Sequence, residues 1–300
     1  MSTSWLVTGA DGQLGHDLRA VLGGRDGDTV TAVGRAGIDL TDEVGTRRAV
    51  RRWLADADAR GDRAVLLNAA AYTAVDAAET DEETAALVNG AAPGWLAQEL
   101  ARHPGGTARL VHVSTDYVFD GTATEPYPVD APIAPRSAYG RTKAAGERAV
   151  AAAGGVAAVV RTAWVYGRHG QNFVATMARL EGERETVSVV ADQVGAPTWS
   201  ADLAGALVEL GARPEPPPPV LHYTNSGQVS WHGFAQAVFE ELGADPARVL
   251  PITTAQFPRP APRPAFSVLD LRAWAAEGLS SPRPWRTALS AAIAAGVGRA

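Results

Sequence analysis

Short apolar runs rich in valine and leucine alternate with longer, more polar segments of helical character through the first half of this chain. A nearly uninterrupted apolar strand is typical of a parallel sheet that is covered on both faces, and parallel neighbours need a crossover, usually a helix. The pattern therefore predicts an α/β fold built on a doubly wound parallel sheet. The expected strands are residues 5–8, 30–33, 65–68, 110–114 and 156–162, followed by the shorter 187–190, and the expected helices are 13–22, 84–100 and 137–153.

The alternation loosens after about residue 165. Two proline-rich stretches, RPEPPPP at 213–219 and PRPAPRP at 258–264, are incompatible with a helix or a central strand, and a single amphipathic helix is expected at 231–242 between them. We therefore expect a first domain at residues 1–165, to which the chain returns around 186–215, and a smaller α/β C-terminal lobe formed mainly by residues 166–300.

Composition excludes several classes of protein. The chain has 46% hydrophobic and 20% charged residues, which is a globular composition, and its net charge of −6 argues against a general nucleic-acid binder. It has no cysteine, so it has no disulfide and no thiolate site, which fits a cytoplasmic protein. No apolar run approaches the ~20 residues of a membrane-spanning helix.

A glycine motif directly follows the first expected strand. Residues 8–15 read TGADGQLG, with glycines at positions 9, 12 and 15, at the start of the first expected helix. Glycines allow a sharp turn and a close approach of phosphate to the backbone, and the helix N-terminus offers unpaired N–H groups. An ordinary glycine turn is the alternative. In this context the motif predicts a dinucleotide site on a Rossmann-type sheet, with the cofactor-binding residues Gly9, Asp11, Gly12, Gln13, Leu14 and Gly15.

The end of the second expected strand bears on which nicotinamide cofactor is used. An acidic residue there would bind the ribose hydroxyls of NAD, whereas a basic residue suits the extra phosphate of NADP. Here the strand ends with Val33, Gly34 and Arg35, and no carboxylate follows in the sequence until Asp39. A solvent-facing arginine is the alternative to a phosphate ligand. We expect Arg35 to bind the 2′-phosphate and the protein to prefer NADPH.

Lys143 is the only lysine among 27 basic residues. It lies four positions after Tyr139 in an expected helix, so both side chains project from one face. Thr115 lies at the end of the fourth expected strand, and ligands of open parallel sheets gather at such strand ends. A phenol can protonate the alkoxide that ketone reduction leaves, and a compact ammonium would lower its pKa. These residues predict a reductase site in which Tyr139 is the acid, Lys143 tunes it and Thr115 polarises the carbonyl.

The glycine motif, STD at a strand end and Y-x-x-x-K together resemble the extended short-chain dehydrogenase/reductases. Several segments, in order along most of the chain, resemble more narrowly the dTDP-4-dehydrorhamnose reductase family. They are NAAAYTAVDAAE (68–79), VHVSTDYVFDG (111–121), AYGRTKAAGE (138–147), RTAWVYG (161–167), NFVATM (172–177), ADQVGAPT (191–198) and FPRPAPRP (257–264).

The resemblance implies NADPH-dependent reduction of the C4 ketone of dTDP-4-dehydro-L-rhamnose to dTDP-L-rhamnose. It implies that Lys143 also holds the nicotinamide ribose. The implied cofactor contacts are Ala69, Ala70 and Ala71 in the trough beside the third strand and Asp39 and Leu40 by the adenine. The implied substrate contacts are Asp116, Trp164 and Asn172 on the sugar side and Gln193, Thr198 and Arg263 on the nucleotide side, with Tyr72, Thr73, Val75 and Asp76 shaping the sugar pocket.

Structural roles are the alternative for several of these residues. Trp164 would then be a core residue, Asp116 a turn former, Gln193 part of an ordered loop and Arg263 a surface arginine. A related ketoreductase of antibiotic deoxysugar synthesis, such as dTDP-dihydrostreptose synthase, is the rival activity. A non-catalytic NADP-binding regulatory subunit is a more distant rival. Such proteins can lose the catalytic tyrosine or lysine, whereas this sequence keeps both Tyr139 and Lys143.

One departure from the family pattern concerns magnesium. Some relatives form dimers through a magnesium ion held by glutamates of three segments. Here Asp17 can replace one carboxylate, but Ala201 stands where the second glutamate aligns, and residues 288–300 contain no acid. The six histidines show no paired metal spacing. Hard cations need several oxygen ligands, so we expect no structural metal and either a monomer or a homodimer that no metal bridges.

Overall fold

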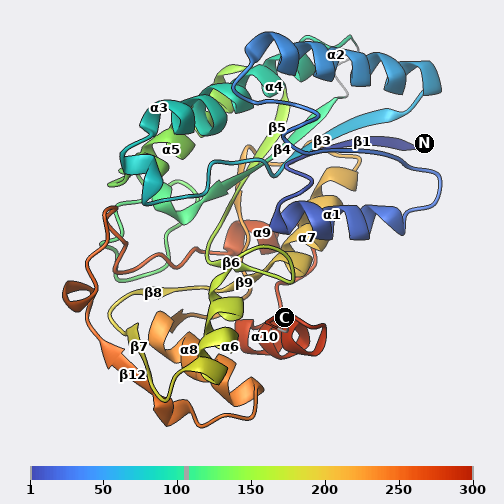
Figure 1. Ribbon diagram of the computed structural model, residues 1–300. Helices are drawn as coiled ribbons and strands as arrows, with labels where there is room; N and C mark the ends of the chain where they lie inside the picture. The colour runs from blue at the N-terminus through green and yellow to red at the C-terminus, as the bar shows by residue number, and fades with distance from the viewer. Residues whose placement is uncertain (1, 105–107, 299–300) are drawn as a thin grey trace.

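The computed structural model describes residues 2–104 and 108–298. Its central sheet has six parallel strands in the order β10-β5-β4-β3-β1-β2 (Figure 1). The strands are β1 (Thr3–Thr8), β2 (Thr29–Val33), β3 (Arg63–Asn68), β4 (Arg109–Thr115), β5 (Val156–Thr162) and β10 (Val220–His222). The predicted doubly wound α/β sheet is confirmed, and its first five strands lie where the apolar runs placed them.

Helices cover both faces of this sheet. On one face, α1, α7 and α9 pack on a core that includes Trp5, Val65 and Leu207, and on the other α2, α4 and α5 pack on a core that includes Leu6, Trp53 and Leu96. The two layers are visible above and below the strands in Figure 1. The helices are α1 (Gln13–Gly23), α2 (Glu43–Arg60), α3 (Glu82–Ala85), α4 (Ala92–Ala101), α5 (Ala138–Ala152), α7 (Ser200–Ala212) and α9 (Arg272–Ala276), with the short η1 (Ala77–Glu79), the π-helical η2 (Ala86–Ala91) and η3 (Asp116–Val118).

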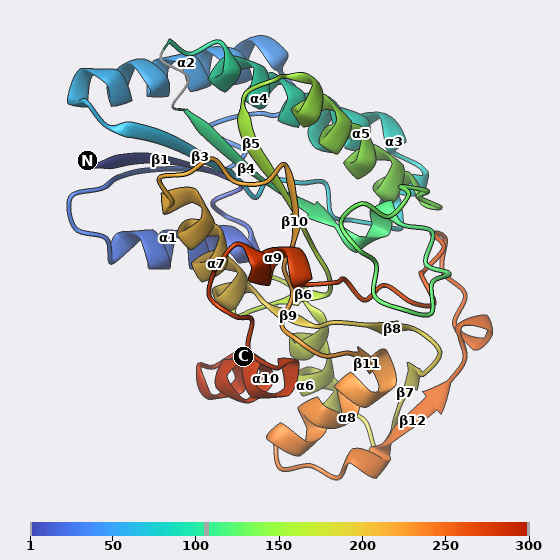
Figure 2. The ribbon, with the colours of Figure 1, turned by 180° about the vertical axis from the view of Figure 1, so that it is seen from behind.

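The remaining elements form a smaller lobe beside the carboxyl ends of the strands (Figure 2). Its own apolar core includes Met177, Phe234 and Leu289. The helices are α6 (Phe173–Glu183), α8 (Trp231–Glu241) and α10 (Trp285–Ala294), with η4 (Pro246–Arg248) and η5 (Thr254–Gln256). Three two-stranded sheets pair β6 (Val165–Tyr166) with β9 (Thr198–Trp199), β7 (Val187–Val190) with β12 (Val249–Ile252) and β8 (Val194–Gly195) with β11 (Val229–Ser230).

One predicted strand lies in a different sheet from the expected one. Residues 187–190 form β7, but β7 pairs with β12 in the smaller lobe. The sixth strand of the central sheet is instead β10, which follows the proline-rich connector at 213–219 and pairs with β5. The chain thus enters the smaller lobe, returns to the central sheet with α7 and β10, and leaves it again.

Candidate active site

The glycine loop after β1 needs its glycines for steric reasons. Gly9 has φ of +72°, and a Cβ atom there would lie 2.7 Å from the Ala70 backbone. A Cβ atom on Gly15 would collide with the carbonyl oxygen of Gly9. Gly12 is the N-cap of α1 with extended backbone and without a side-chain cap. The first-turn amides of α1 are therefore left for a ligand, which is the arrangement that binds phosphate at a helix N-terminus.

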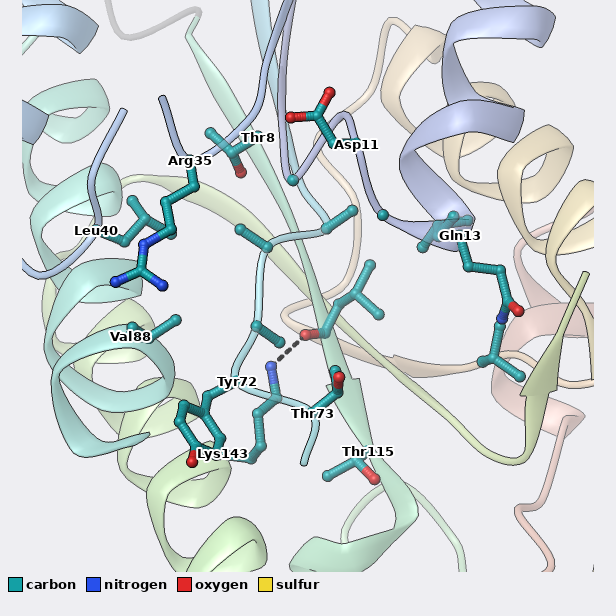
Figure 3. A pocket seen from close by; sticks show the side chains of 18 of the residues that line it. Thr8, Asp11, Gln13, Arg35, Leu40, Tyr72, Thr73, Val88, Thr115 and Lys143 are labelled. Carbon is teal, nitrogen blue, oxygen red and sulfur yellow. Dashed lines mark hydrogen bonds between the residues drawn. The ribbon is translucent and has the colours of Figure 1, made fainter. Parts of the chain in front are cut away.

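A cleft of about 1030 Å³ opens between this loop and the carboxyl ends of the central strands (Figure 3). Most residues predicted from the sequence to form the site line it. These are Gly9, Asp11, Gly12, Gln13, Leu14, Arg35, Asp39, Leu40, Ala69, Ala70, Ala71, Thr115, Asp116, Tyr139, Lys143 and Trp164. Gly15 lies behind the loop, packed on Gly9 and Ala10. The cleft has the size of a ligand site, and its small side chains and free amides fit a dinucleotide.

The end of the cleft beside β2 combines apolar and charged groups. Ile38 and Leu40 are buried in a small apolar cluster to which Val88 of η2 adds. In Figure 3 the exposed Arg35 side chain reaches from the end of β2 toward Val88. The Asp39 carboxylate accepts hydrogen bonds from the amide and hydroxyl of Thr41 at 3.0 and 2.7 Å. These bonds, with the Arg35 charge, lower the pKa of Asp39, so this carboxylate is already engaged in a turn.

Helix α5 carries the tyrosine and the lysine to the other end of the cleft. Ser137 caps the helix by accepting a hydrogen bond from the Gly140 amide at 3.1 Å. One turn beyond Lys143, the buried carboxylate of Glu147 pairs with Arg161 of β5 at 2.7 Å and accepts from the Ser114 hydroxyl at 2.5 Å. Removing one partner of such a buried pair costs about 3–5 kcal/mol. This network fixes α5 against the ends of β4 and β5.

Lys143 is almost fully buried. Its ammonium donates a hydrogen bond of 2.7 Å to the carbonyl oxygen of Val113, the bond drawn in Figure 3. Burial lowers the pKa of Lys143 to about 8, and the Glu147 carboxylate opposes this shift. Since the side chain ends in the cleft, its charge state changes close to the pH at which the protein would work.

Tyr139 corrects one sequence expectation. Burial raises the pKa of Tyr139 to about 12, the Thr115 hydroxyl opposes this shift and the Asp116 carboxylate adds to it. The direction is opposite to the expected lowering by Lys143. The physical reason is that burial disfavours the ionised phenol and the Asp116 carboxylate adds to this, while the ammonium of Lys143 is held at the Val113 carbonyl. At neutral pH the phenol is therefore fully protonated.

Thr115 and Asp116 form a hydrogen-bonded pair at the end of β4. The Thr115 hydroxyl donates to Asp116 Oδ1 at 2.9 Å and accepts from the Tyr117 amide at 3.2 Å. Asp116 Oδ2 is buried and has no hydrogen-bond partner among the described residues. Burial raises the pKa of Asp116 to about 6, against hydrogen bonds that lower it. Protonation of Asp116 would let it donate to Thr115 and free the threonine proton for a ligand.

We expect Asp116→Asn to make stability less dependent on pH. Because the folded-state pKa of about 6 exceeds the ordinary 3.8, folded wild type holds more protons than the unfolded chain between pH 4 and 6 and loses stability as pH rises through that window. The variant should match wild type near pH 4 and exceed it by roughly 1–3 kcal/mol at pH 7. Urea unfolding at both pH values measures this. A difference that is the same at both would contradict the role of ionisation.

Four residues predicted to face the substrate do not line the cleft. The Asn172 side chain caps α6 by accepting from the Ala175 amide at 3.0 Å. Each of the other three also has a protein partner. Gln193 donates to the Thr254 hydroxyl at 2.9 Å, Thr198 is fully buried and donates to the Ala196 carbonyl at 3.4 Å, and Arg263 pairs with Asp76 at 2.9 Å. The geometry thus brings together the cofactor and catalytic sets but not this substrate set.

Trp164 lies in the cleft and joins it to the smaller lobe. It is the only non-glycine residue of the described chain with a positive φ, 49°. Its ring stacks on Trp231 of α8 with centroids 3.5 Å apart. A Cβ atom on Gly195 would overlap the Trp164 ring, so that glycine is needed for close packing. A strained backbone at a cleft residue that the fold holds in place is typical of a functional position.

Sequence reasoning missed several residues that line the cleft. Ile38, Val88, Asp81, Thr84 and Gln171 line it, yet none belongs to a motif. Tyr72 and Thr73, which were expected only to shape a sugar pocket, also line it. Asn89, a polar residue within an apolar stretch, is the one sequence feature that could have indicated the role of the loop containing Tyr72 and Thr73. It accepts from the Tyr72 amide at 2.8 Å and donates to the Tyr72 carbonyl at 3.1 Å, which joins the loop after β3 to the π-helical turn.

No group of three or more metal-ligating side chains is assembled within residues 2–104 and 108–298. Asp17 accepts a hydrogen bond from the Ser200 hydroxyl of α7, and the last two residues of the tail, 299–300, lie outside the described part. The expectation of no structural magnesium stays a prediction. Among the described helices, none is both long and apolar enough to cross a membrane.

Comparison with known proteins agrees with this geometry. A family model described as the RmlD substrate binding domain matches residues 3–297. This chain belongs to the RmlD family. The RmlD-family chain is 49% identical over 289 residues to a Streptomyces antibioticus protein named probable dTDP-4,6-dihydroxy-2-methyloxan-3-one 4-ketoreductase, covering 96% of this chain and 94% of that protein.

Two further relatives extend the comparison of this RmlD-family protein. The dTDP-4-dehydrorhamnose reductase of Streptomyces griseus is 48% identical over 300 residues, covering 99% of this chain and 95% of that one. A crystal structure of dTDP-4-dehydrorhamnose reductase from Bacillus anthracis in complex with NADP superposes with a TM-score of 0.90 at 32% identity, covering 98% of this chain and 100% of that chain. The predicted resemblance and fold are thus confirmed.

Proposed function

We propose that this protein is an NADPH-dependent reductase of a dTDP-linked 4-keto-6-deoxyhexose, converting dTDP-4-dehydro-L-rhamnose to dTDP-L-rhamnose. The observation that carries the proposal is the placement of Thr115, Tyr139 and Lys143 in one cleft with the glycine loop. Two supports come from relatives, namely the reductase of Streptomyces griseus and the NADP complex of the Bacillus anthracis enzyme. Asn172, Gln193, Thr198 and Arg263 lie outside the cleft, and their contact with the substrate remains a proposal.

The cofactor-binding residues would act by position. The amides at the start of α1 would hold the pyrophosphate, the small Ala69 to Ala71 loop would let the dinucleotide approach the backbone, and Arg35 would pair with a 2′-phosphate. NADPH, when bound, supplies the hydride. Lys143 would donate hydrogen bonds to the nicotinamide ribose in exchange for its bond to Val113.

Tyr139 would donate the proton at the C4 oxygen. The pKa of about 12 keeps the phenol protonated at neutral pH, and an alkoxide is a far stronger base than a phenolate, so transfer in the reducing direction is favourable. Thr115 would hydrogen-bond the same oxygen. Because the Thr115 proton points to Asp116, this contact requires that bond to break or Asp116 to be protonated.

The rival activity is a ketoreductase of antibiotic deoxysugar synthesis. Its support is the 49% identity to the Streptomyces antibioticus ketoreductase, and the catalytic residues are the same for both reactions. A non-catalytic regulatory subunit is disfavoured because Thr115, Tyr139 and Lys143 are all present.

An assay on enzymatically prepared keto sugars tests the proposal. We expect NADPH oxidation that depends on dTDP-4-dehydro-L-rhamnose, with dTDP-L-rhamnose identified by NMR and a lower catalytic efficiency with NADH. Turnover of dTDP-4-keto-6-deoxy-D-glucose alone would favour the rival. Absence of oxidation with either sugar, despite cofactor binding, would overturn the proposed reaction.

A further inference from the structure

A carboxylate reaches the end of β2 from another part of the chain. A Cβ atom on Gly34, the residue after β2, would coincide with the carboxylate of Asp11 in the glycine loop. The loop is held there by a hydrogen bond of 3.1 Å from the Ala10 amide to the Val33 carbonyl. Gly34 is thus the surface on which the Asp11 side chain rests, and a larger residue would displace it.

This position is where Rossmann-type folds distinguish the two nicotinamide cofactors. An acidic group at the end of the second strand binds the ribose 2′-hydroxyl of NAD, and an arginine there accommodates the 2′-phosphate of NADP. Here β2 is followed by Arg35, and the carboxylate comes from Asp11. Figure 3 shows both side chains at this end of the cleft, pointing in different directions from the loop and the strand.

Asp11 is the carboxylate at this end that stays available to a ligand. It is exposed, lines the cleft and makes no hydrogen bond or ion pair with another side chain in the described part of the chain. Asp39, the other carboxylate nearby, is occupied by the amide and hydroxyl of Thr41. A free acid and a free arginine therefore flank the same strand end.

We propose that Asp11 and Arg35 act as opposing determinants of cofactor choice, Asp11 accepting from the ribose 2′-hydroxyl of NADH and repelling a 2′-phosphate, and Arg35 attracting that phosphate. The inference rests on the proposed function and deepens it. Unit charges about 4 Å apart near a protein surface interact by roughly 1–4 kcal/mol, so either residue can change the ratio of affinities about tenfold. We therefore expect the protein to retain measurable binding of NADH, because Asp11 would partly offset Arg35.

Direct binding titrations of NADPH and NADH, followed by nicotinamide fluorescence without sugar, test this. Asp11→Asn keeps the shape of the side chain and removes its charge. We expect it to raise the preference for NADPH over NADH about tenfold, mostly by tightening NADPH, and Arg35→Leu to lower the preference by a similar factor. The effect of Asp11→Asn should shrink at high salt.

Asp26→Asn is the matched control, since Asp26 is an exposed aspartate in the turn after α1 and does not line the cleft. It changes the net charge equally and should leave the preference unchanged. The inference would be overturned if Asp11→Asn left the preference for NADPH over NADH unaltered, or changed the affinities for both cofactors equally. Asp11 would then serve only to hold the conformation of the glycine loop. Wild-type protein that binds neither cofactor would instead refute the proposed function.

Discussion

Tyr139→Phe should lower turnover at least about 10²-fold, as expected for loss of a general acid, and should leave the affinity for NADPH within about twofold. The substitution removes only the hydroxyl. The ring keeps its edge-on contact with Tyr117, whose centroid is 5.5 Å away, so α5 should not move. Because the wild-type phenol has a pKa of about 12, the acid form is present at every pH of an ordinary assay, and its loss should be equally severe from pH 6 to 9.

Tyr117→Phe is the control for this variant. Burial raises the pKa of the Tyr117 phenol, so it too stays protonated, but it does not line the cleft. Turnover of the control should stay close to that of wild type. Steady-state kinetics with the keto sugar, together with cofactor titrations, measure both variants. A Tyr139→Phe enzyme that retains more than about a tenth of wild-type turnover would remove the phenol from the mechanism.

The sheet was predictable because its strands are buried on both faces. Residues 65–67 and 156–160, for example, are apolar throughout, and this local property needs no knowledge of neighbours. The partner of a strand is not a local property. The apolar run at 187–190 therefore predicts a strand, but not that this strand pairs with β12 in the smaller lobe. Strand β10 has only three residues after a proline-rich stretch, which is too short for its sequence to predict a strand.

The candidate site was predictable where a residue type has few other uses. Glycines 9 and 15 are fixed by sterics, and the lone lysine stands at helical spacing from a tyrosine. Polar residues such as Asn172 and Gln193 were harder, because a motif does not reveal whether a side chain serves a ligand or its own loop. The pKa direction of Tyr139 depends on burial and on Asp116, which spacing alone does not give. Similarly, reading along β2 could not reveal the carboxylate that Asp11 brings to its end.

Lys143→Arg should lower turnover about as much as Lys143→Met, each by roughly 10²-fold. The buried ammonium reaches the Val113 carbonyl at 2.7 Å, and a planar guanidinium is larger and cannot take the same place. In wild type, turnover should fall as pH rises through about 8, because the pKa of Lys143 lies there and the deprotonated amine loses its charge. Turnover of the methionine variant, which has no titrating group at position 143, should not show that decline.

Stability separates loss of function from loss of fold in these variants. The folded-state pKa of Lys143, about 8, lies below its ordinary 10.5, so the unfolded chain holds more protons between these values and wild-type stability rises across that window. Below pH 8 the buried charge costs roughly 3 kcal/mol. Lys143→Met removes this cost and should unfold at no lower temperature than wild type at pH 7. If Lys143→Arg instead kept near-normal turnover, any buried cation would suffice, and the chemical reason for a single lysine in this chain would be lost.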